Sequence, residues 1–308
     1  MKLERKYNRR FVVTELEHWY DMSLLNPRFL SGFVFRGQGC FDWHIQSSLE
    51  RMIMRFHHNN EIAHKIYPQG YEQDMLREFQ WKYPKYETSN ILHEDEIIEW
   101  LSVMQHYGCP TRMVDFTYSP FVALFMAIDS SNEKNDSAIW FLNELILRNS
   151  YCDSIEKIND AKFDDKESQK EQIYRDANRI LVESIKGNRK DFDKNIYLVQ
   201  PLKVNERILV QQGLFAIPEK IDIPFEDNLF SLVDNPTPDM VPFNEIIEYS
   251  NSEKMFRPND YFLIKMKVPL KFRLEITKAL GLMNISAETM YPGLEGLAKS
   301  LNRQRYTG

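Results

Sequence analysis

Apolar residues in the first half of the chain often recur at the three- and four-residue spacing of an amphipathic helix. This spacing predicts helices over residues 46–80 and 94–107. Residues 11–21 are expected to open another helix, because Thr14 can act as its N-cap and Glu17 follows three positions later.

Two prolines mark the boundaries of further elements. Pro110 ends the preceding helix, since proline lacks the N–H that would continue it. Pro120 suits the first turn of an apolar helix over residues 121–129, with Thr117 or Ser119 as a cap before it.

Short apolar runs predict the strands. They are residues 33–36, 138–142, 208–210, 214–217 and 261–268. Residues 150–195 are strongly charged and predict a solvated helical insertion, whereas residues 219–258 are expected to be irregular loop. Because helices come early, strands come later and no strand–helix repeat alternates, the expected fold is α+β, a helical N-terminal half packed on a mixed or antiparallel β core.

Composition narrows the class of protein. The chain has 308 residues, of which 43% are hydrophobic, and its net charge is −6 with both signs interspersed. No apolar stretch is long enough to cross a bilayer, and the first residues lack the apolar run of a signal peptide. The three cysteines are widely spaced and give no zinc pattern. We therefore expect a soluble cytoplasmic protein without a metal or a membrane partner.

The first candidate for chemistry is Arg36, which follows the apolar run of residues 33–35 and precedes Gly37. An unpaired charge is costly to bury, so a strand that ends in an arginine implies a partner for it. A guanidinium suits a phosphate or carboxylate ligand, and the glycine would let that ligand approach the backbone. The alternative is an arginine paired with a structural carboxylate.

A second cluster of polar residues lies between two apolar helices. It comprises Gln105, His106, Tyr107, Thr111, Arg112, Asp115, Thr117 and Ser119. Loops on rigid scaffolds often carry function, and the density of these groups favours a site. Taken singly, His106 could be a core histidine, Arg112 and Asp115 could pair with each other, and Thr117 and Ser119 could only cap the next helix.

A third segment, residues 205–215, reads as a strand that runs into Gln211, Gln212 and Gly213 before a second strand. Gln212 could donate to or accept from a ligand amide, or it could simply complete the turn.

Together these motifs resemble the FRG domain family. The shared motifs are Phe35-Arg36-Gly37, Gln105-His106-Tyr107-Gly108, Pro110-Thr111-Arg112, Asp115-Phe116-Thr117, Ser119-Pro120 before Ala123, Arg207, Gln211-Gln212-Gly213-Leu214-Phe215 and Tyr291-Pro292-Gly293-Leu294. The resemblance implies a single FRG domain over residues 1–308, with residues 150–195 as a charged helical insertion within it.

A more distant similarity links the chain to arginine-serine-glutamate ADP-ribosyltransferases. It implies that Arg36 holds the NAD phosphates and that Thr117 and Ser119 shape the nicotinamide pocket. The sequence departs from those enzymes at the late strand, where Arg207 stands in place of the catalytic glutamate and Glu206 lies beside it.

The site residues that this similarity implies fall into two groups. The candidate catalytic residues are His106, Asp115 and Glu206, of which Asp115 or Glu206 would supply the carboxylate and His106 a base. The candidate cofactor-binding residues are Arg36, Gly37, Gln105, Arg112, Thr117, Ser119 and Gln212.

The functional expectation is a NAD-using, ADP-ribosyltransferase-like toxin or anti-phage defence effector. NAD would be a substrate, the acceptor would be a protein or a nucleic acid, and a regulatory protein partner is compatible with this setting. One alternative is a non-catalytic module that recognises a nucleotide, RNA or a protein. Another is a metal-independent nuclease in which Arg36 and Arg112 bind phosphate and His106 acts as general acid or base.

Overall fold

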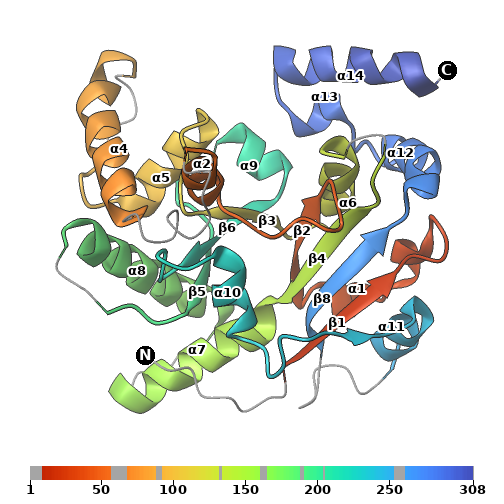
Figure 1. The fold of residues 1–308 in the computed structure, drawn as a ribbon, viewed down its shortest axis with the longest axis horizontal. Helices are drawn as coiled ribbons and strands as arrows, with labels where there is room; N and C mark the ends of the chain where they lie inside the picture. Colours follow the sequence, from red (N-terminus) through yellow and green to blue (C-terminus); the bar gives the residue numbers. More distant parts are fainter. Residues whose placement is uncertain are drawn as a thin grey trace.

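The computed structural model describes residues 9–56, 68–87, 92–131, 134–159, 165–187, 191–203, 205–252 and 261–307. Its centre is an eight-stranded mixed sheet in the order β5-β6-β3-β2-β4-β8-β1-β7 (Figure 1). The strands are β1 (Arg10–Glu15), β2 (Phe33–Gln38), β3 (Val114–Thr117), β4 (Ser137–Asn143), β5 (Ile196–Val199), β6 (Gly213–Pro218), β7 (Asp239–Met240) and β8 (Tyr261–Val268). Neighbours from β5 to β8 are antiparallel, and β1 is parallel to both β8 and β7.

Helices cover both faces of this sheet. They are α1 (Pro27–Leu30), α2 (Ser48–Phe56), α4 (Pro68–Lys82), α5 (Ile97–His106), α6 (Pro120–Asp129), α7 (Glu144–Asn159), α8 (Lys166–Ile185), α9 (Glu206–Val210), α10 (Phe225–Phe230), α11 (Phe243–Ser250), α12 (Arg273–Leu282), α13 (Ala287–Met290) and α14 (Leu294–Thr307). Short 3-10 helices span Asp21–Leu24, Tyr83–Lys85 and Leu270–Phe272. Mixed α and β elements around one sheet agree with the expected α+β class.

The sheet opens between β2 and β3. The two strands pair only at Phe35 and Thr117, although β2 pairs with β4 from Phe33 to Gln38 and β3 pairs with β6 along its length. Polar backbone and side-chain groups of both strands are therefore available to a cleft at this point.

Helix α6 packs directly on β2 and fixes one wall of that opening. Its sequence is apolar almost throughout, Pro120 starts its first turn, and the Ser119 side chain accepts from the Val122 N–H at 3.3 Å. The backbone of α6 comes so close to β2 that a Cβ placed on Gly37 would lie 2.0 Å from the Ala123 carbonyl oxygen. Only a residue without a side chain allows this approach.

Four expectations about the elements are wrong. Residues 11–21 do not open a helix, because the buried run from Phe11 to Val13 forms β1 with β8 and β7. Residues 208–210 are helical, since the Asn205 side chain caps α9 by accepting from the Ile208 N–H at 2.9 Å. Residues 219–258 contain α10, β7 and α11. The separation into early helices and later strands is wrong, because the N-terminal half also supplies β1 to β4.

Most of the described residues of the charged segment 150–195 are helical, as expected, in α7 and α8, but the segment is not simply solvated. Helix α8 buries Ile173, Ala177, Ile180 and Leu181 on one face, where they join a core cluster with β5 and β6. These four residues have helical spacing, so the apolar stripe is present within an otherwise charged sequence.

Candidate functional site

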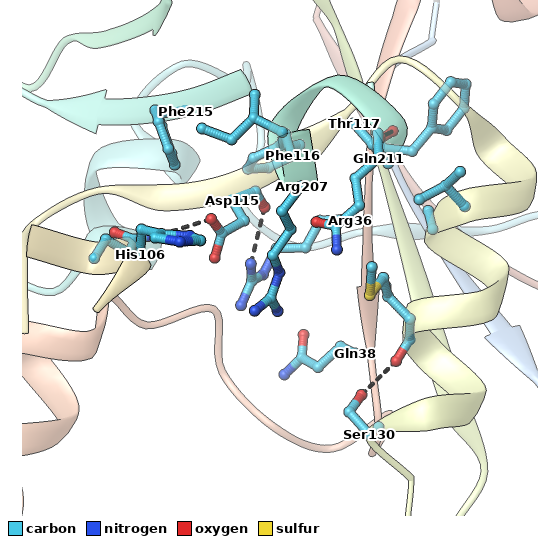
Figure 2. Close-up of a pocket in the computed structure, with 18 of the residues that line it drawn as sticks. Arg36, Gln38, His106, Asp115, Phe116, Thr117, Ser130, Arg207, Gln211 and Phe215 are labelled. Carbon is cyan, nitrogen blue, oxygen red and sulfur yellow. Dashed lines mark hydrogen bonds between the residues drawn. The ribbon is translucent and has the colours of Figure 1, made fainter. Parts of the chain in front are cut away.

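A cleft of about 470 Å³ lies where β2 and β3 diverge (Figure 2). Its lining comes from β2, β3, the segment before α2, the end of α5, α6, α9 and Tyr291. The sequence-predicted residues that meet here are Arg36, Gly37, Gln105, His106, Asp115 and Thr117. Segments far apart in the chain thus bring residues of all three predicted clusters together, because Arg207 and Gln211 of the third segment also line the cleft.

Arg36 is the central cation of the cleft. Its Nη1 donates to the Asp115 carbonyl oxygen at 2.8 Å, but its buried Nε has no hydrogen-bond partner. Burial lowers the pKa of Arg36, the Asp115 charge opposes this shift, and Arg51 adds to it. A guanidinium stays charged in spite of such a shift, so Arg36 presents a positive charge at the cleft with one buried N–H unsatisfied.

The Asp115 carboxylate is held by Gln105. The Gln105 Nε2 donates to Asp115 Oδ1 at 2.6 Å, and the Gln105 Oε1 accepts from the Thr111 hydroxyl. Because the amide is held at both ends, the carboxylate has a defined orientation. Figure 2 shows the Asp115 side chain beside the guanidinium of Arg36.

Arg112 does not reach the cleft. It is almost fully buried and pairs with Glu72, whose carboxylate also accepts from the Arg112 backbone N–H at 3.2 Å. The Arg112 Nη2 donates to the Ser184 hydroxyl at 3.2 Å as well. The alternative in which Arg112 pairs with Asp115 is therefore wrong. Arg112, expected among the cofactor-binding residues, belongs to a core ion pair that joins α4 to the loop before β3 and, through Ser184, to α8.

Thr117 and Ser119 have mainly structural contacts. The Thr117 hydroxyl donates to the Gln211 carbonyl at 2.6 Å and accepts from the Ser119 N–H at 3.0 Å. Thr117 lines the cleft, whereas Ser119 caps α6 and does not. Gly37 also lines the cleft, but the space above its Cα holds α6 rather than room for a ligand.

Glu206 and Gln212 lie outside the cleft lining. Glu206 is exposed in the first turn of α9. Gln212 has a φ of 49° just after α9, and its carbonyl accepts from the Tyr118 N–H at 3.0 Å, so it completes the turn. The neighbouring Gln211 lines the cleft instead, and its Nε2 donates to the Met290 carbonyl at 2.8 Å.

His106 and Arg207 face the cleft from α5 and α9. Burial lowers the pKa of His106, and the positive charge of Arg207 lowers it further, whereas Glu295 raises it. His106 is consequently neutral at neutral pH and can accept a proton. The Arg207 guanidinium lies 4.9 Å from the centre of the Tyr291 ring and 4.0 Å from Glu295, which fixes its position.

Several residues of the lining are not among the candidate site residues named from the sequence. Arg51 approaches from α2, where burial lowers its pKa and the Asp115 charge opposes the shift. Trp43 and Tyr291 also line the cleft. The sequence allowed Arg51 to converge with Arg36 on a local basic cleft, but no local pattern pointed to Trp43.

Two features are absent from the part of the chain that the structure describes. No group of three or more His, Cys, Asp or Glu side chains is arranged to hold a metal ion. Within the same residues, no helix combines the length and the apolar character needed to span a membrane.

Comparison with protein families gives one match. A family model described as FRG domain matches residues 31–136, a stretch that contains the Phe35-Arg36-Gly37 triplet and the cluster from Gln105 to Ser119. Comparisons with curated proteins and with solved structures give no match. The segment that holds Arg36, Gln105, His106 and Asp115 is therefore similar to the FRG domain.

Proposed function

We propose that the cleft binds NAD and that the protein releases nicotinamide and transfers ADP-ribose to an acceptor. The observation that supports this most is Arg36, whose buried Nε lacks a partner. An oxyanion of a pyrophosphate supplies the acceptor that this N–H lacks. Arg207 lines the same cleft, so a further phosphate oxygen finds a donor there.

Asp115 takes the place of the glutamate that the related transferases use. Among the described residues that line the cleft, it is the only carboxylate. When the bond between nicotinamide and ribose breaks, positive charge develops on the ribose, and a nearby carboxylate stabilises it. Neutral His106 is available as a base for the acceptor.

The second candidate function is nucleotide recognition without turnover. It is favoured by Glu206, which stands next to the place of the missing glutamate but is exposed and does not line the cleft. Under this alternative, Asp115 and Gln105 would hydrogen-bond ribose hydroxyls while Arg36 holds phosphate. A toxin or an anti-phage effector remains the biological setting that we propose for either function.

The test uses purified protein with NAD that carries label in the nicotinamide and in the adenine. We expect release of nicotinamide that Arg36→Ala abolishes and that Arg36→Lys only partly restores, because lysine lacks the planar fork of arginine. Arg28→Ala is the matched control, since Arg28 is exposed on α1 away from the cleft. Binding without release would favour recognition, and release that is insensitive to Arg36→Ala would refute the proposal.

A further inference from the structure

A row of arginines leads out of the cleft along α2. Arg51 lines the cleft, and Arg55 is one turn farther along the same face of the helix. The start of α2 is tied to the loop before β3, because Leu49 N–H donates to the Thr111 carbonyl at 3.0 Å and Thr111 N–H donates to the Ser48 hydroxyl at 2.9 Å. This connection holds the helix, and therefore its arginines, beside the opening.

These arginines retain capacity for phosphate. Arg51 donates through Nη1 to the Gln46 carbonyl at 2.7 Å, and no carboxylate of the described residues forms an ion pair with Arg51 or Arg55. The two positive charges lie close enough for Arg55 to lower the pKa of Arg51. If Arg36 holds the pyrophosphate of NAD, the α2 arginines remain for a second phosphate-bearing molecule.

Trp43 adds an aromatic stacking surface at the same opening of the cleft. It lines the cleft and its accessibility is 50%, so a ligand in the cleft can reach the ring. Nucleobases stack on such rings whatever their identity, and cations that follow the backbone together with exposed aromatic rings are typical of single-stranded nucleic-acid sites. The net charge of −6 leaves little general attraction for a duplex, so the recognition is local.

We infer that the acceptor of ADP-ribose is a single-stranded nucleic acid, with its phosphates along Arg51 and Arg55 and one base stacked on Trp43. The inference rests on the proposed function. It names the acceptor class for the same cleft and leaves the identity of the strand, DNA or RNA, to the experiment.

The chemical step balances without a further reactant. The bond between the nicotinamide nitrogen and ribose C1′ breaks, and its electron pair leaves with neutral nicotinamide. A lone pair on an oxygen or nitrogen of the nucleic acid forms the new bond to C1′. The proton of that acceptor atom passes to His106 or to water, while Asp115 stabilises the charge on the ribose.

The test combines binding with transfer. Fluorescein-labelled single-stranded DNA and RNA oligonucleotides of identical sequence are titrated with the protein, and transfer of adenine-labelled ADP-ribose to the unlabelled oligonucleotides is measured in parallel. We expect Trp43→Ala to weaken binding by about 5-fold or more through lost stacking. We expect Arg55→Ala to reduce the slope of the binding constant against salt concentration, plotted on logarithmic axes, by the equivalent of about one phosphate contact. In both variants the ratio of transfer to hydrolysis falls.

Matched controls separate this inference from the proposed function. Trp81→Ala removes another exposed tryptophan, on α4 outside the cleft lining, and Arg28→Ala removes another exposed arginine. Both should leave binding and transfer unchanged. Two results would overturn the nucleic-acid acceptor and leave the NAD reaction standing. In the first, nicotinamide is released but the label appears only on protein or in water. In the second, nicotinamide is released but oligonucleotide binding is insensitive to Trp43→Ala. No nicotinamide release from any sample overturns both.

Discussion

Glu50 offers a quantitative test of the packing between α2 and α10. Burial raises its pKa from 4.5 to about 7, nearby Glu226 adds to the rise, and the Phe225 N–H, the Ser47 contact and Arg51 oppose it. The Phe225 N–H donates to Glu50 Oε2 at 3.3 Å. Glu50→Gln keeps an oxygen acceptor for that N–H and removes the titratable charge.

The size of the effect on stability follows from the pKa of Glu50 in the folded and in the unfolded protein. A folded-state pKa above the unfolded-state value means that the folded protein binds the proton more tightly. The stability from this proton is fully present below pH 4.5 and is lost as the pH rises through about 7. The gap between the values corresponds to at most roughly 3 kcal/mol, and partial solvent access makes about 1–3 kcal/mol the expected effect.

The assay is urea unfolding at constant ionic strength between about pH 5 and pH 8, a range that covers most of the titration of Glu50. Glu50→Gln should gain stability relative to the wild type progressively toward pH 8. Glu248→Gln, at an exposed glutamate of α11, controls for the general loss of one negative charge. A difference between Glu50→Gln and the wild type that stays constant with pH would refute the reasoning.

Three further substitutions test the packing and the electrostatics. Gly37→Ala should lower the unfolding free energy by about 1–3 kcal/mol or more, because its Cβ meets the α6 backbone. Gly281→Ala, with open space around it in α12, should raise the unfolding free energy by about 0.5 kcal/mol. Equal effects of the two substitutions in thermal or urea unfolding would contradict this contrast. Glu72→Gln should cost about 3–5 kcal/mol in urea unfolding, since it leaves a buried guanidinium without its counter-charge, and a loss below about 1 kcal/mol would show that the pair is dispensable. Arg207→Ala should raise the pKa of His106 only in part, because burial, the larger cause of its lowering, remains; an NMR titration that shows no rise would show that the two groups do not interact.

Local patterns were sufficient for elements whose signals lie close together in the chain. The apolar run that ends at Arg36 predicted β2, and Ser119 followed by Pro120 predicted the start of α6. The same kind of signal misled at Thr14, whose spacing from Glu17 imitates a capping box although Thr14 is buried in β1. In that case the pairing of β1 with distant β8 outweighed the local preference.

The site was harder to predict because its contacts are long-range. The cluster from Gln105 to Asp115 was identified, but the partner of Arg112 is Glu72, forty positions away in the sequence. Tyr291 reaches the cleft from the opposite end of the chain. No helical or strand period carries information about such partners, so only the folded sheet decides which polar residues meet.

The three adjacent residues of the Phe35-Arg36-Gly37 triplet each meet a different structural requirement. Phe35 is fully buried and packs edge-on against Phe141 with ring centres 4.9 Å apart. Arg36 faces the cleft, and Gly37 admits the backbone of α6. If the proposed function holds, a descendant that abandoned the chemistry would lose the arginine and still need the glycine and the aromatic ring. In a set of related chains, the residue between an intact Phe and an intact Gly would then separate working copies from pseudoenzymes.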